Sequence, residues 1–281
     1  MADYSLEILA SMGEIDPADW DALIDNASRP LLSHAFLKLL ETSGSICPAT
    51  GWTPAHFLLR RDRPSGPGGT GRLIAAAPFY LRDDSWGDFV FDQEFARAAE
   101  AAGRAWYPKL VGAVPVTPAP AWRVLTAPGE DGPALGELIL QGARDAAKEA
   151  GLGGVHILWP APAQAAALRK RAKAGPEDWV EWPHQAFLWK NRGWADFPAW
   201  LSSFSKNMRR NVLRERKALA EAGISTRVLG PAEAAARPGL IEAFSQLYES
   251  HNDKFGPWAA KFLTPDFFLG LPEAMASGWA L

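Results

Sequence analysis

The chain has 281 residues and a single cysteine, Cys47. One thiol cannot form an internal disulfide or a zinc site built from several cysteines. The five histidines stand far apart, at positions 34, 56, 156, 184 and 251, without the spacing of metal ligands. The sequence therefore predicts neither a disulfide framework nor a metal centre, and it fits a reducing compartment.

Long apolar runs are also missing: no stretch reaches the roughly 20 residues that span a bilayer. The N-terminus, Met1-Ala2-Asp3-Tyr4, lacks the basic start and apolar segment of a signal peptide. The formal net charge is only −3, which argues against general affinity for nucleic acid but permits a local basic patch. We expect a cytoplasmic protein without a membrane span.

Familiar catalytic motifs are absent as well: there is neither a G-x-S-x-G elbow nor a Walker loop. Residues 63–68 match R-x-x-G-x-G, the spelling of the pyrophosphate loop of acetyltransferases. Two prolines remove backbone donors there, and a strand rather than a helix should follow, so we interpret the match as a coincidence. His184 and His251 are candidate bases, although a structural role is commoner for such histidines.

Apolar residues make up 48% of the chain and charged residues 22%, as in globular proteins with large cores. The length suits two domains. The 13 Trp and 14 Phe concentrate in loops such as 86–91 and in strand edges such as 179–189. Aromatic side chains there either line an elongated ligand groove or pack beneath long loops, and both interpretations stay open.

Strand and helix signals alternate along the chain. Strands are expected at residues 4–12, 54–61, 72–82, 107–113, 121–125, 154–159, 179–190 and 224–229, with another beginning at 277. Helices are expected at 17–27, from Ser33, and at 133–150, 162–174, 197–204, 238–251 and 265–276. The helix at 133–150 has its apolar face at helical spacing, formed by Leu135, Leu138, Ile139, Ala143 and Ala146.

A basic helix is expected at residues 206–217, which carry six basic side chains and one acid. At about 100° per residue, one face holds Lys206, Arg210, Arg214 and Lys217, and the other holds Met208, Val212 and Leu219. The apolar face should dock on a core. The cationic face suits phosphate or carboxylate groups; the alternative is an ordinary solvated surface.

Several segments resemble the FemAB-like family of bacterial proteins, often labelled peptidoglycan biosynthesis or recognition proteins. They are A-P-F-Y-L at 77–81, W-G-D-F-V-F-D at 86–92, Y-P-K-L-V-G-A-V-P-V-T-P at 107–118, S-K-N-M-R-R-N-V-L-R-E-R at 205–216 and F-G-P-W at 255–258. The resemblance runs over most of the chain, and the block at 107–118 is its most specific part.

This resemblance implies an α/β (α+β) fold of tandem GNAT-like domains, the acyl-CoA N-acyltransferase fold, with a mixed central sheet. Residues 1–190 would form the first domain, and residues 191–281 the start of a second domain that is incomplete. The implied activity is transfer of an acyl or aminoacyl group from acyl-CoA or aminoacyl-tRNA to an amine, with a cell-wall precursor as candidate acceptor. The alternative is a non-catalytic module that binds an anionic precursor or RNA.

The candidate substrate-binding residues are Lys109, Thr117, Lys206, Arg209, Arg210 and Arg214. Pro115 and Pro118 lack N–H groups, so residues 114–118 cannot continue the ladder of the strand at 107–113, and the strand should bulge or splay there; a plain Pro-rich loop is the alternative. We expect the cationic helix face to share a groove with residues 107–118 and to bind a phosphorylated or nucleotide-linked ligand, with tRNA as a candidate partner. Asp88 and Asp92 either hold an amine or are solvated. No catalytic base is assigned.

Overall fold

The computed structural model describes residues 4–25, 30–61, 71–174, 179–185, 187 and 189–275. The chain forms two compact units, which are described separately below. Unit 1 comprises Met1–Trp179 with Gly230–Leu281, and unit 2 comprises Val180–Leu229. The domain division expected at residue 190 separates two tandem repeats. The division into compact units does not test this, so it stays a prediction.

Unit 1 contains two four-stranded sheets, ordered β1-β3-β4-β7 and β2-β5-β6-β8. Neighbouring strands are antiparallel except β6 and β8, which are parallel, so the architecture is mixed, as the sequence predicts. The strands are β1 (Tyr4–Leu9), β2 (Trp52–Pro54), β3 (His56–Arg61), β4 (Arg72–Ala77), β5 (Phe79–Arg82), β6 (Lys109–Gly112), β7 (Leu125–Thr126) and β8 (Val155–Ile157).

A single bent hairpin joins the two sheets. Its first arm is β2 followed by β3, and its second arm is β4 followed by β5. Pro78 interrupts the second arm because proline has no N–H to donate to a ladder. The pairing nevertheless continues across the break, since Ala55 N donates to Phe79 O at 2.9 Å. The two sheets are therefore parts of one continuous, bent surface.

The strand beside this hairpin is split. β6 pairs with β5, and β7 pairs with β4, so two segments fill one strand position and residues 113–124 leave the sheet between them. β6 ends at Gly112, before Pro115, and this confirms the predicted interruption. Trp122 closes the gap: its backbone N–H donates to Trp159 O just beyond the end of β8. The parallel ladder of β6 and β8 thus ends where the loop departs.

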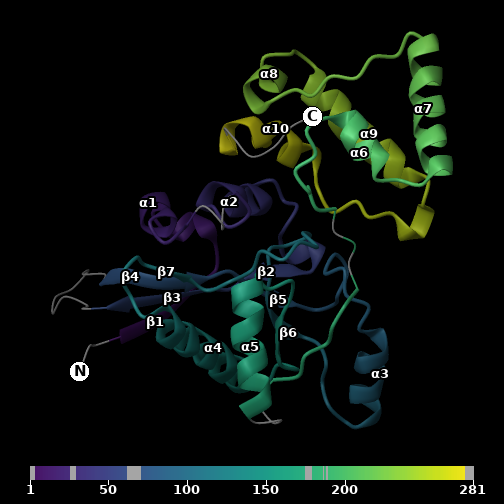
Figure 1. Ribbon diagram of the computed structural model, residues 1–281. Helices are drawn as coiled ribbons and strands as arrows, with labels where there is room; N and C mark the ends of the chain where they lie inside the picture. Colours follow the sequence, from purple (N-terminus) through teal and green to yellow (C-terminus); the bar gives the residue numbers. More distant parts are fainter. Residues whose placement is uncertain are drawn as a thin grey trace. The chain divides into compact units, whose positions relative to one another are not determined.

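Helices cover both sides of the sheet in unit 1, with α1 and α2 on one face and α4 on the other (Figure 1). The helices of this unit are α1 (Pro17–Asp21), α2 (His34–Thr42), α3 (Gln93–Ala101), α4 (Gly132–Glu149), α5 (Pro162–Ala174), α8 (Pro231–Ala235), α9 (Leu240–Asp253) and α10 (Pro265–Ala274), with 3₁₀ turns at η1 (Met12–Glu14), η2 (Pro48–Thr50) and η3 (Gly256–Trp258). Side-chain caps fix several starts; Asp131, for example, accepts from Ala134 N at the start of α4.

The main core lies between α4 and the sheet. Trp122 is fully buried at its centre, donates Nε1–H to Pro78 O at 2.8 Å, and meets Phe79 edge-on with ring centroids 5.5 Å apart. Burying an apolar side chain of this size stabilises the fold by roughly 1.5–3 kcal/mol or more. Gly112 is needed here, because a Cβ would lie only 2.8 Å from atoms of Trp122 and Ile157.

The chain segment after unit 2 returns to pack on unit 1. α10 contacts α2, where Phe267 meets Phe36 edge-on with ring centroids 6.1 Å apart. Thr264, the N-cap of α10, donates its Oγ1–H to Ser43 O at 2.8 Å, and its backbone N–H donates to Ser45 Oγ at 3.0 Å. These bonds attach the start of α10 to the loop that follows α2.

Several expected elements differ in the structure. The helix expected at 17–27 ends at Asp21. The expected strands at 179–190 and 224–229 are wrong: residues 179–185, 187, 189–190 and 224–229 contain no strand. A strand needs a neighbour to pair its backbone groups, and the described part of unit 2 offers none. The R-x-x-G-x-G match at 63–68 and the strand expected from 277 lie outside the described residues.

Unit 2 is small and helical. It contains α6 (Phe197–Ser202) and the basic helix α7 (Lys206–Glu221), whose N-cap Ser205 accepts from Met208 N. The basic helix is confirmed, but its expected docking is not: α7 buries none of its side chains, and Met208 is 48% exposed. With only one short companion helix in the unit, little apolar surface is available to cover that face.

Candidate functional site

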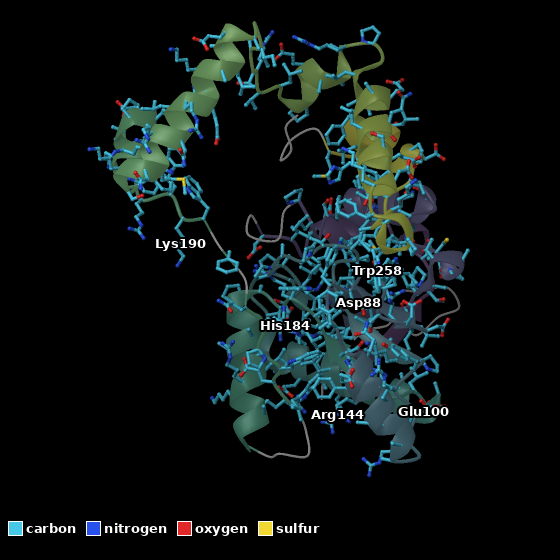
Figure 2. The ribbon with its side chains drawn as sticks, turned by 90° about the vertical axis from the view of Figure 1, so that its right-hand side faces the viewer. Asp88, Glu100, Arg144, His184, Lys190 and Trp258 are labelled. Carbon is cyan, nitrogen blue, oxygen red and sulfur yellow. The ribbon has the colours of Figure 1, made fainter. Side chains whose placement is uncertain are left out.

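A buried charged cluster lies beneath the loop at residues 84–92 of unit 1. Lys109 on β6 is only 1% exposed, and its Nζ lies 2.5 Å from Asp92 Oδ2 and 2.6 Å from Ser85 Oγ. Asp88, which is labelled in Figure 2, is also buried. Its Oδ2 lies 3.9 Å from the same ammonium group. Burying three charges is tolerated only when they pair with one another, so this cluster fixes the loop on the sheet.

Arg82 at the end of β5 anchors the other side of this loop. Its side chain is fully buried; Nε donates to Asp88 Oδ1 at 3.2 Å, and Nη2 donates to Asp84 Oδ1 at 3.0 Å and to Trp86 O at 2.6 Å. The guanidinium also lies 3.7 Å from the ring centroid of Trp52, a close cation–π contact. One arginine thereby holds three positions of the loop.

The pKa values of the two carboxylates in the cluster are shifted in opposite directions. Burial raises the pKa of Asp88 to about 6, although Arg82 and Lys109 act against this. Burial alone would raise the pKa of Asp92 too, but hydrogen bonds from Lys109 and Trp106 outweigh it and lower that pKa to about 2. Carboxylates with pKa values driven apart are typical of sites that assign them different roles.

Asp88 also has spare capacity to accept a proton. Its Oδ2 accepts no hydrogen bond from any described residue, whereas Asp92 accepts from Trp106, Tyr107 and Lys109. The nearby His156 on β8 has its pKa lowered to about 4 by burial and by repulsion from Lys109, so it is neutral at pH 7. Asp88 is therefore the carboxylate of this cluster that changes charge near neutrality.

Three residues in or beside loop 84–92 have strained backbones. Phe89, Val116 and Trp159 have φ values of 55°, 47° and 49°, a region that side-chain-bearing residues rarely adopt. Trp159 Nε1 donates to Asp88 O at 3.1 Å, and a Cβ on Gly87 would lie 3.2 Å from Val116 Cγ1. Such strain costs about 1–3 kcal/mol per residue and gathers at functional sites. Two of these residues, Val116 and Trp159, follow shortly after the last paired residues of β6 and β8.

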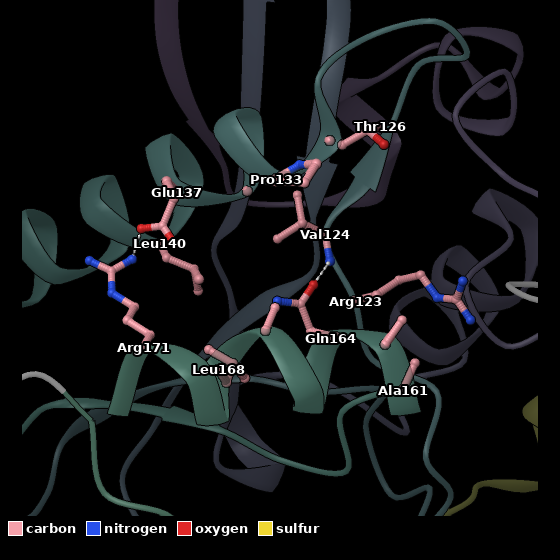
Figure 3. Close-up of a pocket in the computed structure, with 14 residues that line it drawn as sticks. Arg123, Val124, Thr126, Pro133, Glu137, Leu140, Ala161, Gln164, Leu168 and Arg171 are labelled. Atoms are coloured by element: carbon pink, nitrogen blue, oxygen red, sulfur yellow. Dashed lines mark hydrogen bonds and ion pairs between the residues drawn. The ribbon is translucent and has the colours of Figure 1, made fainter. Parts of the chain in front are cut away.

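A pocket of about 280 Å³ lies on the α4 side of the same split strand, between α4, α5 and β7 (Figure 3). Its lining residues are Arg123, Val124, Thr126, Gly132, Pro133, Gly136, Glu137, Leu140, Ala161, Ala163, Gln164, Ala167, Leu168 and Arg171. Val124 N, on a stretch without a strand neighbour, donates to Gln164 Oε1 at 3.2 Å. The Gln164 side chain thus accepts the hydrogen bond that a neighbouring strand would otherwise accept.

The charged side chains at this pocket are Arg123, Arg171 and Glu137. Arg171 is paired with Glu137, and Arg123 donates to Asp25 Oδ2 at 3.3 Å. The first amides of α4 are already used, since Ala134 N donates to the capping Asp131. An anionic ligand here would be held by the guanidinium groups rather than by free helix amides.

The structure places the predicted binding residues in both units. Lys109 is buried in the charged cluster and Thr117 is half-buried, donating to Pro115 O at 2.9 Å, both in unit 1. In unit 2, Lys206, Arg210 and Arg214 are exposed on α7, while Arg209 donates to Phe204 O at 2.6 Å. That the two sets act on one ligand stays a prediction.

Sequence reasoning left two alternatives for Asp88 and Asp92, a bound amine or solvation. Both side chains are buried, so they are not solvated, and the amino group beside them is that of Lys109; binding of a ligand amine stays a prediction. Arg82 and Gln164 were missed. Arg82 ends an apolar strand, where a lone cation is usually solvated, and Gln164 starts a helix, where polar residues are ordinary. The candidate bases His184 and His251 are exposed, and each lies against an aromatic ring.

Within the described ranges, no three or more histidine, cysteine, aspartate or glutamate side chains gather as a metal site would require. Across the same residues, no helix has both the length and the apolar character needed to cross a bilayer.

Comparison with known proteins gives one match. The family model FemAB_like, described as peptidoglycan biosynthesis/recognition, matches residues 11–281. No curated protein and no solved structure matches the chain significantly. The family description implies a transferase activity related to peptidoglycan. Because the match covers nearly the whole sequence, the chain belongs to the FemAB-like family.

Proposed function

We propose that this protein transfers an acyl or aminoacyl group from an activated donor to an amine of a peptidoglycan precursor. The observation that carries the proposal is the split strand after Gly112, where Trp159 and Val116 adjoin loop 84–92 at Asp88 and Gly87. The split leaves Val124 N–H without a strand partner, and a pocket of about 280 Å³ lies beside it. Strand order in unit 1, with only the last strand parallel to its neighbour, supports a GNAT-like arrangement by analogy.

The donor would lie in the pocket between α4 and α5. A narrow amide-containing arm, such as that of acyl-CoA, replaces the Gln164 carbonyl as the acceptor for Val124 N–H. Arg123 and Arg171 then pair with donor phosphates, which suits rigid guanidinium forks. An aminoacyl-tRNA donor would use the same charges. Of the two donors, acyl-CoA is the smaller and therefore fits a pocket of about 280 Å³ better.

Acyl transfer to an amine needs few covalent steps from the protein. The neutral amine attacks the acyl carbonyl, a tetrahedral intermediate forms, and the donor leaves as a thiol or alcohol while the amine loses a proton. Holding both reactants in line supplies much of the acceleration. The proton lost by the amine goes to the departing sulfur or oxygen, so no net proton is released. Asp88 contributes in this proposal by holding loop 84–92 against Trp159.

A non-catalytic binding module is the second candidate. It is favoured by the burial of Asp88, Asp92 and Lys109, which pair mainly with one another and with Arg82. In that case the exposed cations of α7 would bind an anionic precursor without turnover.

Turnover separates the two candidates. Purified protein is incubated with a panel of acyl-CoA donors and with lysine-containing or diaminopimelate-containing stem peptides, and free CoA and acylated peptide are quantified by mass spectrometry. Transfer that is reduced at least tenfold in Arg171→Ala, but not in the exposed control Lys170→Ala, supports the proposal. Peptide binding without transfer from any acyl-CoA or aminoacyl-tRNA donor would favour the binding module.

A further inference from the structure

Unit 2 contains a pocket of its own, of about 360 Å³. It is formed within a short segment, by Trp189, Asn191, Trp194, Asp196, Phe197 and Trp200. Four of these six side chains are aromatic, and the other two carry an amide and a carboxylate. A few polar groups set among aromatic rings is the usual composition of a small-molecule site.

The aromatic rings form two shallow, tilted pairs. Trp189 and Trp194 have ring centroids 6.0 Å apart at an interplanar angle of 30°, and Phe197 and Trp200 are 5.2 Å apart at 38°. The Trp189–Trp194 pair does not close face-to-face, so these two indole rings are the ones available to a ligand; the ring of Phe197 is already covered by Arg216. Trp189 is 65% exposed, an unusual state for the largest apolar side chain unless something covers it.

The polar side chains of the pocket are held in place by the backbone. Asp196 Oδ1 accepts from Ala199 N at 2.7 Å, which caps α6 and leaves Oδ2 to accept from a ligand. Asn191 Oδ1 accepts from Gly193 N at 2.9 Å, which leaves its Nδ2 group to donate. The site therefore presents one acceptor and one donor beside flat apolar surfaces.

Charge decides which ligand fits. Aromatic pockets also recognise quaternary ammonium groups, but those cages need a negative surrounding. Here the Arg216 guanidinium already lies 4.4 Å from the ring centroid of Phe197, and the exposed cations Lys190 and Arg192 flank Asn191 in the chain. Against these three cations the pocket has one carboxylate, Asp196. A cationic ligand is disfavoured, and a neutral ring that carries an acidic group is favoured.

We infer that this pocket binds a saccharide ring bearing an acidic substituent. The C–H faces of a pyranose ring stack on the indole rings, its hydroxyl groups pair with Asp196 and Asn191, and its acidic group lies toward the basic side chains. Membership of a peptidoglycan-related family makes a glycan ligand of this kind reasonable. The inference does not depend on acyl transfer.

The test uses the full chain and ligand-observed NMR with titration calorimetry. The probes are N-acetylmuramic acid, which carries a carboxylate, N-acetylglucosamine, which is neutral, and choline. Wild type should bind N-acetylmuramic acid more tightly than N-acetylglucosamine. Trp189→Ala, which removes an already exposed ring, should weaken binding of both sugars at least tenfold, whereas Trp258→Ala, which removes a 78% exposed ring in unit 1, is the matched control and should change neither affinity. Arg216→Ala should weaken only the acidic sugar.

The inference is overturned if wild type binds neither sugar at millimolar concentration, if Trp189→Ala leaves affinity unchanged, or if choline binds in preference to both. Circular dichroism on each variant confirms that it is folded, and Trp194→Phe, which keeps an aromatic ring, should retain measurable binding. A protein without transferase activity that still binds N-acetylmuramic acid through Trp189 would support this site and contradict only the proposed function.

Discussion

Lys109 Nζ lies 2.5 Å from Asp92 Oδ2, and both side chains are almost completely buried. This ion pair joins β6 to the loop before α3, and it lies next to the buried Arg82–Asp88 pair. A buried pair is weak evidence for stability as such, but removal of one partner leaves the other uncompensated. The cluster is therefore the part of unit 1 most sensitive to a single change of charge.

Asp92→Asn should destabilise unit 1 by about 3–5 kcal/mol, because the Lys109 ammonium would stay buried without its anion. Urea denaturation followed by tryptophan fluorescence measures the change. Asp83→Asn, at an exposed position nearby, is the control and should shift stability by less than about 0.5 kcal/mol. An equal, small effect in both variants would show that the pair is not needed for folding.

Asp88 should make stability depend on pH between about 4 and 6. Its pKa is raised in the folded state, so folding is favoured when it is protonated, and its contribution to stability falls as pH rises through about 6. His156 acts oppositely, because its lowered pKa penalises folding as pH falls below its usual value. The difference between wild type and Asp88→Asn therefore isolates the carboxylate.

This difference is obtained from denaturation curves at pH 4, 5, 6 and 7. The stability of Asp88→Asn minus that of wild type should be highest at pH 7 and should fall toward pH 4, whatever its absolute sign. A difference that is constant across this range would contradict the raised pKa. Asp92 should add a pH dependence only below this range, since its stabilisation is fully present above about pH 4 and is lost as pH falls toward 2.

Trp122→Ala should destabilise the core by about 3–5 kcal/mol, because it empties the space beside Phe79 and removes the hydrogen bond to Pro78 O. Trp122→Phe keeps most of the volume and should cost clearly less. Thermal unfolding of the two variants checks the order. If Phe were as harmful as Ala, the indole hydrogen bond rather than packing would dominate.

Arg210→Ala should weaken binding of a phosphorylated ligand by about tenfold or more, since a charge-assisted contact is worth roughly 1.5–3 kcal/mol. The guanidinium is exposed on α7, so wild-type affinity should also fall as salt rises. Calorimetry at two salt concentrations, with acyl-CoA or a nucleotide-linked sugar as ligand, tests both points. Lys254→Ala, at an exposed position in unit 1, is the control because it removes the same charge. An equal loss of affinity in both variants would show that only the net charge matters, not the position of Arg210.

Local sequence signals placed the helices well. The helix expected at 133–150 is α4 (Gly132–Glu149), with Asp131 as its cap. Leu135, Ile139 and Ala143 are buried as expected, but Leu138 is exposed and Leu140 is buried instead. The 3.6-residue period locates a helix, whereas the exact rotation of its buried face depends on the sheet against which it packs.

The basic helix, the break at Pro115 and the family were determined by the sequence alone, because capping, missing N–H groups and motif spelling are properties of neighbouring residues. The burial of Lys109 with Asp92, the placement of Val116 and Trp159 beside loop 84–92, and the failure of residues 224–229 to form a strand depend on chain segments far apart in the sequence. Only tertiary structure decides these, since a charge is buried or a ladder completed by whichever partner the fold brings to it.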